Sequence, residues 1–249
     1  MDMGTVLAAL DESTVGVFAY VMRSGRPNAC AVTPYVVDGA ATVTSTLALI
    51  DKAAAVRRDQ RVTLLAGGAH LAGRASVSVD LTPSWFDQHL RAQERAKYPP
   101  ARSILGVPGH RCLFSWYLGR VVISIDGTEA GARPGNDHTT ITVLDSTGSL
   151  QTFPLAELDD ATAETIPVPS LPEGQAVVLI HEENESMTSM RQLAIHGNVA
   201  AGVFTAERRR GSLEPGPNGL GEQLRTARAL ARQAKANRPR LQSWPATTT

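Results

Sequence analysis

Residues 41–80, ATVTSTLALIDKAAAVRRDQRVTLLAGGAHLAGRASVSVD, decide the fold of this chain. They open with a β-branched and hydroxyl-rich run, Thr42 to Thr46, whose composition favours a strand. Residues 50–58 are rich in alanine with lysine and arginine, which predicts two helical turns. Two further strands are predicted on either side of a Gly-Gly turn, at residues 61–66 and 70–79. We therefore expect a strand, a short helix and a hairpin in succession.

The junction between the first strand and the helix has the chemistry of a phosphate site. Thr44, Ser45 and Thr46 place hydroxyls at the strand end, and Lys52 lies in the first helical turn. Backbone amides at a helix N-terminus attract anions, and a lysine adds charge-assisted hydrogen bonds. Each feature alone is also typical of an ordinary strand end or a solvated helix. Together they form a geometry that can hold a phosphate group.

The spacing of these residues resembles the flavin-binding split β-barrels of the pyridoxamine 5′-phosphate oxidase-like family. The pattern runs from Thr46 through Lys52 to the turn Arg57-Arg58-Asp59-Gln60-Arg61, which is similar to an Arg-Arg-Asp-Pro-Arg turn in that family. The resemblance covers residues 5–125. It implies that the strand hydroxyls, Lys52 and Arg57 belong to a cofactor site.

The resemblance also implies a floor for the site and a cofactor. In the family the second strand runs beside the flavin ring, which places Ala31 and Val32 there. Cys30 next to them is expected to be a small apolar strand residue rather than a catalytic group. The implied cofactor is FMN, with a deazaflavin coenzyme as the alternative. Deazaflavin-binding members often carry an arginine near position 50 and an asparagine near position 55, where this chain has Ile50 and Ala55.

The implied activity is that of a flavin- or deazaflavin-dependent oxidoreductase acting on a small organic substrate. Pyridoxamine phosphate oxidases carry a basic residue in the strand before the hairpin, whereas residues 28–33 are uncharged here, so oxidation of that vitamin is not expected. The sequence singles out no catalytic residue. The alternative is a non-catalytic flavin- or haem-binding protein of the same fold. In the haem-binding case, which is the less favoured of the two, His181 or His196 would bind the haem.

The whole chain is predicted to be mainly β, of the α+β class. We expect an antiparallel split β-barrel at residues 1–126, closed by strands at 111–117 and 120–125. A second, smaller β-rich half follows at residues 127–206, and its strand and glycine pattern echoes the first half, as in a degenerate barrel copy. Residues 207–249 form a connector and a C-terminal helix.

That helix is predicted at Leu220–Asn237 and is expected to end at Pro239. Residues 207–249 hold nine basic and three acidic side chains, which is a pattern that nucleic-acid-binding tails show. An apolar stripe favours packing on protein instead; its members are Leu220, Leu224, Ala227 and Leu230. We therefore expect no nucleic-acid partner.

Composition limits the remaining possibilities. The 24 basic and 24 acidic residues balance, so no net field draws the chain to nucleic acid or to a membrane surface. No apolar run approaches the ~20 residues of a membrane span, and the first residues lack a basic signal region, which predicts a cytoplasmic protein. Cys30 and Cys112 match no metal spacing, nor do the six histidines, so no metal site is expected.

A flavin needs most of its surface enclosed, and residues 1–125 supply only one side. In the family the other wall comes from a second barrel related by two-fold symmetry. We therefore predict a homodimer with the cofactor between two chains. The alternative is that residues 127–206 of the same chain supply the second wall.

Overall fold

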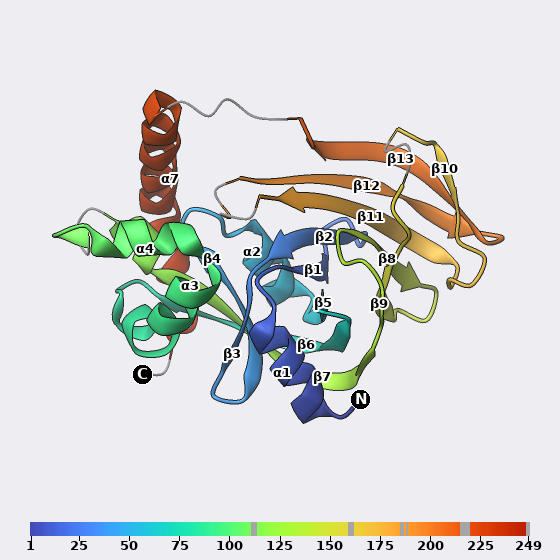
Figure 1. Ribbon diagram of the computed structural model, residues 1–249, viewed down its shortest axis with the longest axis horizontal. Coiled ribbons are helices and arrows are strands. Elements are labelled where there is room, and N and C mark those ends of the chain that lie inside the picture. The colour runs from blue at the N-terminus through green and yellow to red at the C-terminus, as the bar shows by residue number, and fades with distance from the viewer. Residues whose placement is uncertain (111–113, 159–161, 185–186, 188, 215–219, 248–249) are drawn as a thin grey trace.

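The first sheet has seven strands, all paired antiparallel in the order β2-β1-β5-β6-β7-β4-β3 (Figure 1). The computed structural model describes residues 1–110, 114–158, 162–184, 187, 189–214 and 220–247. The strands of this sheet are β1 (Gly16–Val21), β2 (Pro27–Val32), β3 (Pro34–Val37), β4 (Ala40–Thr46), β5 (Arg61–Ala66), β6 (Ala69–Asp80) and β7 (Arg120–Ala132).

This sheet curls into the split barrel that the sequence predicts. β2 and β3 stand at its two opposite edges, yet only Thr33 separates them in the chain. Two edges can be one residue apart only if the sheet bends until they meet. The β-type run of residues 27–37 therefore forms two strands, β2 and β3. Pro34 has no N–H and fixes its own φ, which suits the first position of an edge strand at this corner.

A second antiparallel sheet has six strands in the order β10-β13-β12-β11-β8-β9. Its strands are β8 (Thr139–Asp145), β9 (Leu150–Pro154), β10 (Thr165–Pro167), β11 (Gly174–Glu183), β12 (Met190–Ala200) and β13 (Val203–Ser212). It covers the outer face of β1 and β2, where Val17 and Ala19 pack with Val177 and Leu179. Every residue of β1 is consequently buried, one face by the barrel core and the other by the second sheet.

Helices cover the ends and one flank of the barrel. They are α1 (Met3–Glu12), α2 (Asp51–Arg58), the π-helix η1 (Phe86–Leu90), α3 (Arg91–Lys97), α4 (Pro99–Gly106), α6 (Ser115–Leu118) and α7 (Leu220–Leu241). The strand predicted at 111–117 is wrong where it can be compared, because α6 begins at Ser115; residues 111–113 lie outside the described part. Phe114 to Leu118 pack into a small core with η1 and α4, which overrides their β propensity.

The C-terminal helix α7 packs on the barrel, as predicted. Ala234 and Leu241 are buried in the main core, and the Asn237 side chain donates hydrogen bonds to the Leu47 and Ala48 carbonyls at 3.0 and 3.1 Å. The helix continues two residues past Pro239 instead of ending there. The predicted stripe members Leu220 and Leu224 have side chains outside the described part. No described helix is long and apolar enough to cross a membrane.

The boundary predicted at residue 126 falls within β7, which continues to Ala132 along β6. The connection between the halves is therefore part of the barrel sheet itself. The division of the chain into three domains stays a prediction.

Candidate functional site

The predicted hydroxyls and lysine line one cavity of about 320 Å³ at the corner where the barrel is split. This volume lies at the lower end of the range for small-molecule sites, roughly 300–1,000 Å³. The cavity is bounded by the β2–β3 corner, the end of β4, the first turn of α2, and the η1–α4 region. Its lining consists of Ala31, Val32, Thr33, Tyr35, Thr44, Ser45, Thr46, Leu49, Lys52, Glu94, Tyr98, Tyr117, Arg120, Met187 and Met190.

Six of the seven residues predicted to bind the cofactor are in that lining. They are Ala31, Val32, Thr44, Ser45, Thr46 and Lys52. The seventh, Arg57, is not; its guanidinium lies 4.8 Å from the centre of the Trp244 ring. Lys52 therefore faces the cavity, whereas Arg57 is exposed and contacts the C-terminal segment.

Three residues of this lining hold buried polar atoms without a hydrogen-bond partner. They are Ser45 Oγ, Thr46 Oγ1 and Arg120 Nε, among nine such atoms in the described residues. A buried polar atom without a partner costs about 1–3 kcal/mol. The N-terminus of α2 also lacks a side-chain cap, since Ile50 occupies that position. The donors collected around this cavity thus match a ligand rich in acceptor oxygens, such as a phosphate ester.

A buried charged cluster forms the deep side of the cavity, and the sequence analysis missed it. Glu94 accepts hydrogen bonds from Tyr35, from Tyr117 at 2.5 Å and from Arg120 at 2.8 Å. Arg120 is 2% exposed and Glu94 5%. Burial, followed by the Glu94 charge, raises the pKa of Tyr35 and of Tyr117, so both phenols stay protonated donors.

The position of Arg120 beside the hydroxyls follows from strand register. β4 and β7 pair so that Thr46 stands directly opposite Arg120. Both strand ends therefore meet at the same corner of the barrel. An arginine opening the apolar run RVVISI was the available sequence signal. Its partner Glu94 lies 26 residues away on a separate helix, which no local pattern indicates.

The second half of the chain reaches this cavity. Met187, between β11 and β12, and Met190, the first residue of β12, are part of its lining, and Met187 is buried. The Gln192 side chain accepts a hydrogen bond from the Ala31 backbone N–H at 3.0 Å. This bond satisfies an edge-strand donor of β2, next to the expected floor of the site. A wall from residues 127–206 is therefore present within one chain.

Cys30 stands on β2 opposite Phe18 and is not in the cavity lining. Burial raises the pKa of its thiol, an effect that the nearby Lys52 charge only partly opposes. A thiol with a raised pKa is a poor nucleophile, in keeping with the structural role expected for Cys30. Cys112 lies outside the described residues.

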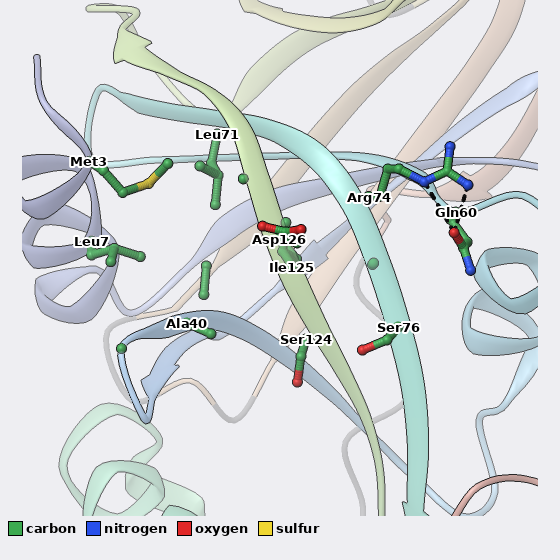
Figure 2. Close-up of a pocket in the computed structure, with 14 residues that line it drawn as sticks. Met3, Leu7, Ala40, Gln60, Leu71, Arg74, Ser76, Ser124, Ile125 and Asp126 are labelled. Atoms are coloured by element: carbon green, nitrogen blue, oxygen red, sulfur yellow. Dashed lines mark hydrogen bonds between the residues drawn. The ribbon is translucent and has the colours of Figure 1, made fainter.

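A larger cavity, of about 630 Å³, lies between α1 and the strands β4, β6 and β7 (Figure 2). Its one basic side chain, Arg74, already donates to Gln60 at 2.7 and 3.2 Å. Arg74, Ser76 and Asp126 are exposed to solvent. None of the unpartnered buried atoms found in the described residues belongs to its lining. We therefore place the candidate site in the smaller cavity.

Comparison with solved structures finds similar barrels. A Listeria innocua protein provisionally named a pyridoxamine 5′-phosphate oxidase is 23% identical, covering 52% of this chain and 96% of its own, with a TM-score of 0.38. A conserved hypothetical protein from Mycobacterium tuberculosis is 17% identical over 66% of this chain and 95% of its own, with a TM-score of 0.39. An F420 reductase is 16% identical over 50% and 94%, with a TM-score of 0.36.

These matches include proteins of the kind that the sequence resembles. Since the identities are below 25% and the TM-scores below 0.5, the matches do not tell us which cofactor or substrate this chain uses. No protein-family model matches the sequence, and no curated protein is significantly similar to it.

The two histidines considered for haem lie away from this cavity. His196 stands on β12, where burial lowers the pKa of its imidazole with help from the Arg208 charge. His181 stands at the far end of β11, hydrogen-bonded to Glu183. Neither is in the cavity lining, so a haem in this cavity would have no histidine ligand from the residues that line it.

Proposed function

We propose that this chain binds FMN in the 320 Å³ cavity and acts as a flavin-dependent oxidoreductase on a small organic molecule. A deazaflavin coenzyme is the alternative cofactor. The observation that carries the proposal is the coincidence, in one cavity, of Lys52 with two buried hydroxyls that lack partners, Ser45 Oγ and Thr46 Oγ1.

In this proposal each part of the cavity has a distinct task. Lys52 and the hydroxyls of β4 bind the phosphate, where the first-turn amides of α2 add their partial positive charge. Ala31 and Val32 border one face of the flavin ring, while Met187 and Met190 exclude water from the other side. Methionine side chains suit this task because they are apolar and adapt their shape to flat aromatic surfaces.

Bound flavin would supply hydride or electron transfer, and the protein would supply position and electrostatics. Tyr35 and Tyr117 remain protonated and fixed on Glu94, so the deep side of the cavity keeps a constant charge pattern. Arg120 is paired with Glu94 at 2.8 Å. No residue of this cluster needs to donate its own proton for the ring to exchange a hydride.

The test is an FMN titration of the purified chain, in which binding is measured by the quenching of flavin fluorescence. Lys52→Ala is expected to weaken binding by about 1.5–3 kcal/mol, the range for a hydrogen bond to a charged group, which is roughly 10- to 150-fold in Kd. Arg58→Ala is the matched control, because Arg58 is an exposed cation on the same helix outside the cavity lining. Equal affinities for wild type, Lys52→Ala and Arg58→Ala would refute the site.

Catalysis is tested separately from binding. The FMN-loaded chain is mixed with reduced nicotinamide and then with small organic electron acceptors, while the flavin absorbance is followed. If the chain is an oxidoreductase, the flavin absorbance falls when reduced nicotinamide is added and returns when an electron acceptor is added. FMN that binds in a Lys52-dependent way but exchanges electrons with neither would make the chain a non-catalytic flavin-binding protein.

A further inference from the structure

A second group of chemically reactive side chains lies where β8 begins and β11 ends, outside the lining of the flavin cavity. The His181 backbone N–H donates to the His138 carbonyl at 2.9 Å, which extends the β8–β11 pairing by one residue and places the two histidines opposite each other. Glu183 lies two residues along β11, on the same face as His181. Cross-strand pairing thus brings together residues that are 43 positions apart.

The possible ligand atoms of these three residues all lie within 4.8 Å of one another. His181 Nδ1 lies 2.9 Å from Glu183 Oε2, and His138 Nδ1 lies 3.7 Å from Glu183 Oε1. Ligands bound to zinc at about 2.0–2.1 Å in a tetrahedral arrangement stand roughly 3.3 Å apart. The two measured separations bracket that value, so small side-chain rotations are enough to admit an ion.

We propose that His138, His181 and Glu183 bind a divalent transition-metal ion of the zinc class. Two imidazoles and one carboxylate are a ligand set that such ions prefer, and the set leaves one or more coordination positions open. The absence of a metal motif in the sequence does not conflict with this, because the ligands are joined by strand pairing and not by local spacing.

The surroundings of His181 support a ligand role for its Nδ1. Its other ring nitrogen, Nε2, faces the Asp137 carbonyl at 3.0 Å, and metal-binding histidines ordinarily donate their second N–H to such an acceptor. His181 is 2% exposed and therefore held in place, whereas the His138 side chain is 54% exposed and open to solvent. An ion could enter from the side of His138.

The proposed ion would lie where the two halves of the chain meet. Asp137 accepts a hydrogen bond from the Gly67 N–H, in the β5–β6 turn of the barrel, at 2.6 Å. Asp137, His138, His181 and Glu183 line one cavity of about 390 Å³ together with residues 12–15 of the barrel. This cavity shares no residue with the flavin cavity, so the metal site is independent of the proposed function.

The test is equilibrium dialysis of the full chain against Zn²⁺. We expect about one Zn²⁺ per wild-type chain. His138→Ala and Glu183→Gln should each weaken binding by about 100-fold, since loss of outer-shell partners alone costs 10- to 100-fold. His110→Ala is the control, because that histidine lies outside the cluster and should leave affinity unchanged.

A second readout separates metal binding from folding. Zn²⁺ should raise the melting temperature of wild type and of His110→Ala but not that of His138→Ala, because a ligand stabilises only a chain that binds it. In chelator all three chains should melt alike, since His138 is mostly exposed. Wild type that holds no more Zn²⁺ than the double variant His138→Ala/Glu183→Gln, or equal losses in the His110 control, would overturn the proposal.

Discussion

Replacing Glu94 by glutamine removes one charge from the buried cluster while keeping the shape of the side chain. Glu94 lies between three donors: the Tyr35 and Tyr117 hydroxyls and the Arg120 guanidinium. In Glu94→Gln the guanidinium of Arg120, 2% exposed, loses its counter-ion. The glutamine amide also presents two N–H donors where only acceptors are required, so at least one tyrosine hydroxyl loses its partner.

The expected cost follows from the burial of both partners. Breaking a buried ion pair by removing one partner costs about 3–5 kcal/mol, because an uncompensated charge remains in the interior. For a chain of this size 1 kcal/mol corresponds to about 2–4 °C, so the melting temperature should fall by about 6–20 °C. The exposed pair Arg26–Glu207 has side chains 42% and 46% exposed, and such pairs contribute about 0–1 kcal/mol. Glu207→Gln is therefore the matched control.

Thermal and urea unfolding, followed by circular dichroism, measure both variants against wild type. A double variant, Glu94→Gln with Arg120→Met, removes the unpaired charge as well and should recover much of the lost stability, as apolar replacements of buried ion pairs do. The reasoning is wrong if Glu94→Gln behaves like Glu207→Gln. It is also wrong if Arg120→Met gives no recovery in the Glu94→Gln background.

Three further predictions concern stability and assembly. Burial, with help from the Arg133 charge, lowers the pKa of His70 from 6.5 to about 4, so its stabilising effect is complete above pH 6.5 and is lost as pH falls toward 4. The difference in unfolding free energy between wild type and His70→Gln should change by about 3 kcal/mol over that window, and urea titrations that give a pH-independent difference would contradict it. Trp244→Ala should cost about 3–5 kcal/mol in urea unfolding, because Trp244 is buried against the barrel; an unchanged midpoint would mean that the C-terminal segment does not pack there. Light scattering of FMN-loaded protein distinguishes a single-chain site at 26.5 kDa from the homodimer predicted from the sequence, with twice that mass.

The β5–β6 hairpin of the barrel was predictable because its signals are local. Gly67 and Gly68 both adopt positive φ, as the Gly-Gly turn requires, and β5 and β6 begin and end within a residue or so of the predicted bounds. The grouping of Thr44, Ser45, Thr46 and Lys52 around one cavity was predictable for the same reason, since they belong to one continuous stretch. Here sequence neighbours are also neighbours in space.

The rest of the site depends on pairings that no local pattern encodes. Arg120 reaches Thr46 through strand register, Glu94 reaches Arg120 through the docking of a helix, and Met187 reaches the cavity through packing of the second sheet. Arg57 lies outside the cavity lining and against Trp244, which is 187 positions away. In each of these cases tertiary packing, and not local sequence, determines whether the residue reaches the cavity.

The contribution of the second half bears on how many sites the protein has. A symmetric pair of barrels has two equivalent corners, each with its own phosphate-binding segment and each walled by the other chain. In the described residues, β4 and α2 carry the hydroxyls and lysine of the cavity. The second half contributes Met187 and, from the start of β12, Met190 and Gln192, whose side chain accepts a hydrogen bond from the Ala31 N–H. A second sheet that only borders the cavity does not need a phosphate-binding strand–helix junction of its own. Under the proposed function, the sheet of residues 139–212 supplies the packing face of a partner barrel without its binding chemistry, which predicts one flavin bound per 26.5 kDa chain.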